Sequence, residues 1–301
     1  MVMENEKYLI WHVQGGLGKN IAATALCKYI KLRYPDRQLI LVCTYPEIFL
    51  NMPMIDRVYG LDKLSYFYET YIENKDVIIF KHDPYDQTGH ITGKNHIIES
   101  WCEILDIEYT KPPPLLDLNY AQQLTKYKFT NPKPILILQT TGGIDNIDGK
   151  ETPPYSWSRD IPLELSLEIV KKYSSNYHII HITKKNGYYL PNVERIDYKI
   201  PSMELFALLS ISTKRILIDS ALQHASAAFK MHSTVFWIGT SPKVFGYDIH
   251  TNIEADITSI SNQLMNSYEY PHLNYFNEES CPYKDANSIF NIQEVLNELG
   301  N

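Results

Sequence analysis

The sequence is poor in cysteine and lacks any long apolar segment. Its four cysteines form no C-x-x-C pair and show no zinc-ligand spacing. Cys27, Cys43 and Cys102 fall on apolar faces, so we predict small buried side chains in a reducing compartment. Every apolar run is far shorter than the ~20 residues that a membrane-spanning helix needs. Residues 1–10 include acidic side chains and no signal-peptide pattern, which predicts a cytoplasmic protein without a transmembrane segment. Contact with a membrane surface stays compatible with this composition.

The chain also lacks an excess of positive charge. Its net charge is −7, whereas proteins that bind nucleic acid non-specifically usually carry a basic patch or stripe. We therefore expect no such binding, although a local basic site for a diphosphate is compatible with the composition. With 301 residues, 44% apolar and 21% charged, the chain is long and apolar enough for two folded domains.

A glycine-rich turn at residues 14–20, with the sequence QGGLGKN, is the most informative feature. It follows an apolar run, residues 8–13, and opens a helix-patterned run that reaches Tyr34. A strand, a glycine-rich turn and a helix in this order bring backbone N–H groups up to an anion. The turn predicts a nearby phosphate or diphosphate, with five candidate residues: Gly15, Gly16, Gly18, Lys19 and Asn20.

The rest of the first half alternates strands and helices. Residues 9–13, 39–43 and 76–81 read as buried strands, and helical stripes precede Pro35 and cover residues 97–105. This pattern predicts a parallel sheet. The prolines between Pro112 and Pro134 mark the expected connection to a second domain.

The second half repeats the alternation, with strands at 135–139, 178–183, 215–219 and 234–238, and helices at 162–174, 202–212 and 223–229. We therefore predict an N-terminal domain, residues 1–130, and a C-terminal domain, residues 131–301. The amphipathic run 289–299 is a candidate to pack back on the N-terminal half. Ligands are expected at the carboxyl ends of the strands, facing the cleft.

Several blocks in this order resemble one family. They comprise residues 15–20, 51–58 (similar to an N-P-x-I-D-x-V segment), 140–143, 158–159, 202–209, 219–224 and 237–242. Together they are similar to the heptosyltransferases of lipopolysaccharide assembly, glycosyltransferase family nine. The resemblance implies an α/β protein of GT-B fold, with two Rossmann-like doubly wound parallel-sheet domains facing a cleft. It also implies a metal-independent, inverting transfer from a nucleotide-diphosphate sugar to a glycan or other hydroxyl acceptor, with no cofactor.

The sequence departs from the family in two segments. The family reads D-S-G-P-M-H where this chain has DSALQH at residues 219–224. The family's G-D, whose aspartate is the proposed base, aligns with Gly18-Lys19 here. A lysine can act as the base only if its pKa is strongly lowered. The sugar, the nucleotide, the acceptor and the retention of activity are therefore left open.

Candidate donor-binding residues cluster at two turns of the second half. Asp219 and Ser220 end a strand and begin a helix; they are either ordinary N-caps or ligands of the donor diphosphate, together with Gln223 and His224. His224 matches a family position, although a lone helical histidine is more often structural.

The remaining candidates belong to other loops. Arg159 matches a loop position where the family places a basic residue near the phosphates, and otherwise it is a solvated arginine. Thr140 and Thr141, at the end of a strand facing the cleft, are candidates for hydroxyl contacts to the same phosphates. Lys19 is a candidate cation across the cleft, and otherwise a surface lysine. Asp83, at the end of the strand at 76–81, is the candidate catalytic base, and otherwise a turn residue.

Two other classes compete with a transferase. The 14–20 turn is close to the loop of partitioning-type P-loop ATPases, but Asn20 stands where a hydroxyl must bind Mg²⁺, and Gln14 replaces the signature lysine. A non-catalytic sugar-nucleotide or glycan binder of the same fold also fits, because Lys19 replaces the family's base. A dinucleotide dehydrogenase is poorly supported, since G-x-G-x-x-G is absent.

Overall fold

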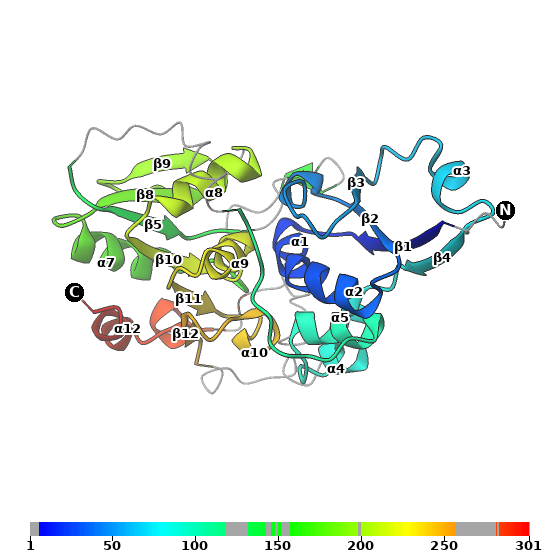
Figure 1. Ribbon diagram of the computed structural model, residues 1–301. Helices are drawn as coiled ribbons and strands as arrows, with labels where there is room; N and C mark the ends of the chain where they lie inside the picture. The colour runs from blue at the N-terminus through cyan, green and yellow to red at the C-terminus, as the bar shows by residue number, and fades with distance from the viewer. Residues whose placement is uncertain are drawn as a thin grey trace.

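The computed structural model describes residues 6–117, 132–142, 146–147, 150–151, 157–197, 200–256, 281 and 283–300. Two separate parallel sheets, one in each half of the chain, are flanked by helices (Figure 1). The predicted α/β class with two Rossmann-like halves is confirmed. The expected boundary at residue 130 lies outside the described residues and stays a prediction.

The first sheet has the strand order β3-β2-β1-β4, and every neighbouring pair is parallel. Its strands are β1 (Lys7–Val13), β2 (Gln38–Cys43), β3 (Arg57–Gly60) and β4 (Asp76–Phe80). The chain runs from β1 outward to β3 and then returns to the other side of β1, so the strand order reverses between β1 and β4. The sequence predicted β4 as a buried strand, but it forms an edge of this sheet, and Ile79 is 44% exposed.

The helical run after β1 is interrupted by a tight turn. It consists of α1 (Leu17–Ala23), a 3-10 turn (Thr24–Leu26) and α2 (Cys27–Arg33). The buried Thr24 hydroxyl donates to the Ile21 carbonyl at 2.6 Å and accepts from the Leu115 amide at 2.7 Å. A side-chain hydroxyl that enters the backbone ladder in this way bends a helix. Thr24 thus ties the helix to the segment that leaves the first half.

The other helices of the first half are α3 (Phe67–Tyr71), α4 (Thr88–Ile91) and α5 (Ile97–Leu105). Trp101 of α5 packs edge-on against Trp11 of β1, with 5.9 Å between ring centroids. The predicted burial of Cys27, Cys43 and Cys102 is confirmed.

The second sheet has the order β12-β11-β10-β5-β8-β9, again with parallel neighbours. Its strands are β5 (Ile135–Gln139), β8 (His178–Thr183), β9 (Glu194–Asp197), β10 (Lys214–Ile218), β11 (Thr234–Trp237) and β12 (Thr251–Glu254). The helices are α7 (Leu163–Tyr173), α8 (Ser202–Ser210), α9 (Ala221–Ala228) and α10 (Pro242–Phe245). A small hairpin pairs β6 (Asn146–Ile147) with β7 (Lys150–Glu151). The strand order reverses between β5 and β10.

The C-terminal helices α11 (Ala286–Ile289) and α12 (Ile292–Glu298) belong to the second half. The expectation that this segment packs back on the N-terminal half is wrong. Val295 and Leu299 join the apolar core beneath α7. The Tyr173 hydroxyl donates to the Leu299 carbonyl at 2.9 Å, and Lys214 Nζ donates to the same oxygen at 3.0 Å. The apolar face of α12 is thus covered by the second half of the chain.

In the part of the chain that the structure describes, no helix combines the length and the apolar character needed to cross a bilayer.

We expect Thr24→Val to lower the free energy of unfolding by about 1–3 kcal/mol, because the substitution leaves the Leu115 amide without its acceptor. Urea denaturation measures the change. Thr70→Val is the matched control, since the exposed Thr70 hydroxyl bonds only the Tyr66 carbonyl of its own turn. Equal losses in the two variants would show that the Leu115 hydrogen bond contributes nothing.

Candidate active site

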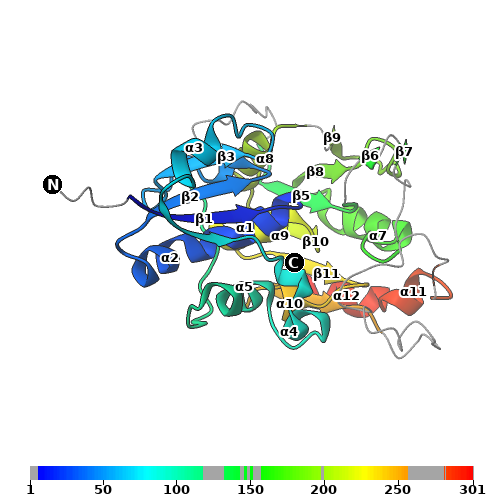
Figure 2. The same cartoon turned by 90° about the vertical axis from the view of Figure 1, so that its right-hand side faces the viewer.

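The strand order reverses between β1 and β4 in the first sheet and between β5 and β10 in the second. The loops that follow these strands lie on either side of the interface between the two halves. In doubly wound sheets, ligands bind at such points, beyond the carboxyl ends of the strands. The N-terminal ends of α1 and α9 meet here (Figures 1 and 2). A Cβ on Gly18 would lie 2.8 Å from Cδ2 of His224 and 3.4 Å from Cα of Ala221. Only glycine at position 18 allows this close approach.

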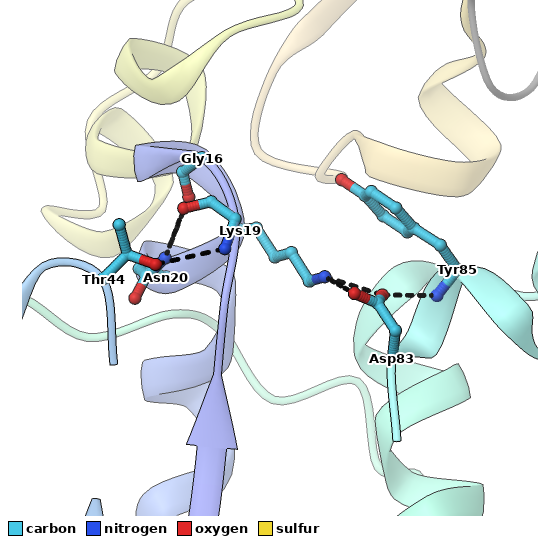
Figure 3. Close-up of polar contacts among 7 residues, drawn as sticks. Gly16, Lys19, Asn20, Thr44, Asp83 and Tyr85 are labelled. Carbon is cyan, nitrogen blue, oxygen red and sulfur yellow. Dashed lines mark hydrogen bonds and ion pairs between the residues drawn. The ribbon is translucent and has the colours of Figure 1, made fainter. Parts of the chain in front are cut away.

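The predicted glycine-rich turn is closed by hydrogen bonds to the side chains of Asn20 and Thr44 (Figure 3). Gly15 has a φ of +105°, which favours glycine, and its amide donates to the Thr44 hydroxyl at 3.2 Å. The buried Asn20 amide group donates to the carbonyls of Gly15 and Gly16 at 3.2 and 3.0 Å. Asn20 therefore stabilises the turn and does not face a ligand.

Lys19 and Asp83 form an ion pair across the β1/β4 reversal point. Lys19 Nζ lies 2.6 and 2.5 Å from the two carboxylate oxygens of Asp83 (Figure 3). The ammonium group also lies 4.4 Å from the centroid of the Tyr85 ring. Burial lowers the pKa of Lys19, and the Asp83 carboxylate opposes this shift. Both residues were predicted site residues, but the sequence did not predict that they form a pair.

Asp83 also begins the short 3-10 turn Pro84–Asp86, because its carboxylate accepts from the Tyr85 amide at 3.0 Å. Asp83 is thus a turn residue, as the alternative prediction had it. The Asp83 side chain is 38% exposed, so its carboxylate is accessible although it bonds Lys19 and Tyr85.

Asp219 and Arg159 lie together at the β5/β10 reversal point. The Asp219 carboxylate accepts from the Thr240 hydroxyl at 2.7 Å and lies 3.9 Å from the Arg159 guanidinium. Across the described ranges, Arg159 forms no hydrogen bond, and its side chain is 31% exposed. Its guanidinium donors are therefore available to an anion.

Ser220 is the N-cap of α9, which is one of the two roles predicted for it. Its hydroxyl accepts from the Leu222 amide at 3.4 Å and donates to the Gln139 side chain at 2.8 Å. Since the single hydroxyl proton is used, the expected hydroxyl donation to a diphosphate is not available in this conformation. The Ala221 amide, first in the helix, has no hydrogen-bond partner within the described residues, so the helix N-terminus keeps a free donor.

Three further predicted donor residues are buried and bonded within the protein. The Thr140 hydroxyl pairs with His181 Nε2 at 2.7 Å. The Thr141 hydroxyl lies 3.1 Å from that of Thr183 and accepts from the Lys184 amide at 2.8 Å. The Gln223 side chain donates to the Phe245 carbonyl at 3.0 Å. These groups shape the loops around the site, and their side chains do not reach its surface here.

His224 contacts the first half. Its Nδ1 lies 2.7 Å from the Tyr247 hydroxyl, and its ring edge faces Gly18. Burial lowers the pKa of His224 to about 3, with smaller contributions from His96, His250 and Arg159. The imidazole is therefore neutral near pH 7 and acts as a packing surface between the halves.

Sequence reasoning missed one cation of this site. Lys184 is buried at the carboxyl end of β8, with Nζ 3.6 Å from an Asp160 carboxylate oxygen. The other Asp160 oxygen accepts from the Gly142 amide at 3.0 Å. Lys184 directly follows the predicted strand at 178–183, so the rule that ligands bind at carboxyl ends of strands could have found it. Searching the described residues finds no three His, Cys, Asp or Glu side chains grouped to hold a metal ion.

Two Rossmann-like halves that meet through their carboxyl-end loops define the GT-B fold, and solved structures share it. A family 9 glycosyltransferase from Veillonella parvula superposes with a TM-score of 0.64 at 13% identity, covering 98% of this chain and 97% of that one. The iron-containing dodecameric glycosyltransferase TibC from enterotoxigenic E. coli gives 0.67 at 14% identity, covering 99% and 77%. The E. coli heptosyltransferase WaaC with ADP gives 0.54 at 13% identity, covering 97% and 100%.

No family model and no curated protein matches the sequence. At these identities the likeness is one of fold, and in fold the predicted resemblance to family nine is confirmed.

We expect Gly18→Ala to destabilise the contact between the halves, costing about 1–3 kcal/mol, because the new methyl group overlaps the buried His224 ring. Thermal and urea unfolding measure the loss, and small-angle scattering tests whether the halves separate. Gly16→Ala is the control, since a Cβ there meets nothing within 4 Å. If the two variants behave alike, the close approach of α1 and α9 does not hold the halves together.

Proposed function

We propose that this protein is a glycosyltransferase that moves a sugar from a nucleotide-diphosphate donor to a hydroxyl group of an acceptor. One observation carries the proposal: the two reversal points of strand order face each other across one interface. Cations and a helix N-terminus lie on the C-terminal side, and an accessible carboxylate lies on the N-terminal side. The shared GT-B fold supports the same assignment.

The C-terminal side suits the donor. A diphosphate leaving group gains negative charge as the bond to the anomeric carbon breaks, and fixed cations and helix amides stabilise that charge. Here the Arg159 guanidinium, Lys184 and the Ala221 amide supply these groups without a metal ion. Among proteins of this fold, WaaC has been solved with ADP and TibC with ADP-D-β-D-heptose, which supports a nucleotide-diphosphate donor.

The N-terminal side suits the acceptor. In the proposed step, Asp83 takes the proton of the acceptor hydroxyl, whose oxygen bonds to the anomeric carbon while the bond to the diphosphate breaks. A base and a leaving-group site on opposite sides of the sugar favour attack from the face opposite the diphosphate, hence inversion. Lys19, which replaces the family's aspartate, orients the Asp83 carboxylate. The acceptor is a glycan or another hydroxyl compound, in the cytoplasm.

A non-catalytic sugar-nucleotide binder is the second candidate. It is favoured by one specific observation: both Asp83 oxygens already bond Lys19, so the carboxylate is partly occupied. A P-loop ATPase is not favoured, because Asn20 turns to the backbone and Lys19 binds Asp83.

We expect a nucleotide-diphosphate sugar from a panel of ADP, UDP, GDP and dTDP sugars to raise the melting temperature. Arg159→Ala should weaken binding by about 1.5–3 kcal/mol, because a charge-assisted hydrogen bond to phosphate is lost. Isothermal titration calorimetry measures this, with Arg57→Ala, an exposed arginine on β3, as the control. Absence of binding by every donor in the panel would refute the donor site.

Asp83→Asn should lower kcat by roughly 10²–10⁴-fold, the usual contribution of a general base, while nucleotide affinity stays the same. Product formation from radiolabelled donor, compared with calorimetry on the same variant, separates the two effects. Asp86→Asn is the matched control, since Asp86 is an exposed carboxylate of the same 3-10 turn. Donor binding without turnover in the unmodified protein, across a broad acceptor set, would favour the non-catalytic binder.

A further inference from the structure

A second pocket lies at the junction of the two halves and is not used by the proposed reaction. Its volume is about 480 Å³, within the range of small-molecule sites. The first half contributes the start of α5 and the segment from Tyr109 to Pro113, and the second half contributes the end of α9, α10 and residues 246–249. Helices α4, α5 and α10 lie together at this junction (Figures 1 and 2). A ligand here would contact both halves at once.

The pocket wall is positively charged. Four lysines line it, Lys94, Lys111, Lys230 and Lys243, against two carboxylates, Glu99 and Asp248. Lys111 lies 3.8 Å from Asp248, and in the described part of the chain the other three lysines form no ion pair. Tyrosine, proline and isoleucine side chains supply apolar surface beside them. The chain as a whole is acidic, so this local excess of positive charge contrasts with the rest of the molecule.

Two of these lysines occupy strained backbone positions. Lys111 has a φ of +52° and Lys230 a φ of +57°, in the left-handed region that favours glycine. Lys230 follows the end of α9, where its amide bonds the Ala227 carbonyl and the Met231 amide bonds the Ser226 carbonyl. Glycine is the usual residue in this helix-ending motif. A lysine at either position therefore carries backbone strain that glycine would avoid.

A single side chain, Tyr247, connects the pocket to the contact between α1 and α9. Tyr247 lines the pocket, and its hydroxyl lies 2.7 Å from His224, whose ring packs on Gly18. His96, also in the pocket wall, packs edge-on against Tyr247, with 5.4 Å between ring centroids. An occupant would therefore lie beside side chains that also support the interface of the candidate active site.

We propose that this pocket binds a phosphate ester. The excess of lysines matches a phosphate dianion, and the apolar wall accommodates the organic group that carries it. The ester is either a free phosphorylated metabolite or the headgroup of an anionic phospholipid. Binding at this pocket does not require that the protein transfers sugars.

The test uses the full chain carrying Arg159→Ala, so that phosphate binding at the candidate donor site is weakened. Glycerol 3-phosphate and glucose 6-phosphate are titrated by calorimetry, and vesicles containing phosphatidic acid are compared with phosphatidylcholine vesicles by co-sedimentation. The same measurements are made with Lys111→Gly and Lys230→Gly added. These changes remove charge at positions where glycine fits the backbone, so we expect the variant to fold at least as stably. Lys63→Gly, at an exposed lysine outside the pocket, is the control.

We expect the double glycine variant to weaken binding by roughly tenfold or more, and the Lys63 control to leave it unchanged. Loss of soluble ester binding identifies a metabolite, and loss of phosphatidic acid binding alone identifies a lipid headgroup. If neither probe binds, or if binding is insensitive to the double variant, the inference is wrong. That outcome leaves the proposed transferase activity untouched, because donor affinity and turnover are measured separately.

Discussion

The contact of Gly18 with His224 is the constraint on which the site depends. Without a side chain at position 18, the N-terminal ends of α1 and α9 approach closely, and the loops of both sheets come to one interface. Burial keeps the His224 imidazole neutral, so the contact needs no counter-charge and imposes no unpaired buried ion. Tyr247 holds the ring from the other side. This polar but uncharged contact lies beside an apolar core that includes buried residues of both halves, among them Ile21 and Leu222.

The charged groups around this contact are balanced in pairs. Lys19 pairs with Asp83, Lys184 lies near Asp160, and Arg159 lies near Asp219. A buried cation without such a partner would be costly, so each carboxylate offsets part of the cost of burying its cation. The pairs are not equally tight. Lys19 bonds both Asp83 oxygens, whereas Arg159 is 3.9 Å from Asp219, so Arg159 is held less tightly by its carboxylate than Lys19 is.

Much of the fold could be predicted from the sequence, because central strands of a parallel sheet are buried on both faces and read as continuous apolar runs. The edge strands β3, β9 and β12 carry mixed side chains and escaped prediction, and β4 was assigned to the interior. At the site, the sequence located the two loops that carry Lys19 and Asp219. It could not predict that the Thr140 hydroxyl bonds His181, because that partner comes from a neighbouring strand. The pairing of Lys19 with Asp83, 64 residues apart, depends on the same tertiary information.

The strand order shows why the proposed base can lie on the loop after β4, although the family resemblance assigns it to the position of Lys19. Strands β1 and β4 are neighbours, so the loops that follow them lie at one edge of the sheet. A carboxylate supplied after β4 therefore reaches nearly the same place as one supplied after β1. In the proposed mechanism Asp83 takes this place, and Lys19 fixes its orientation from the loop where the family carries the acid. Under this proposal, position in the fold, more than position in the sequence, decides which residue faces the acceptor.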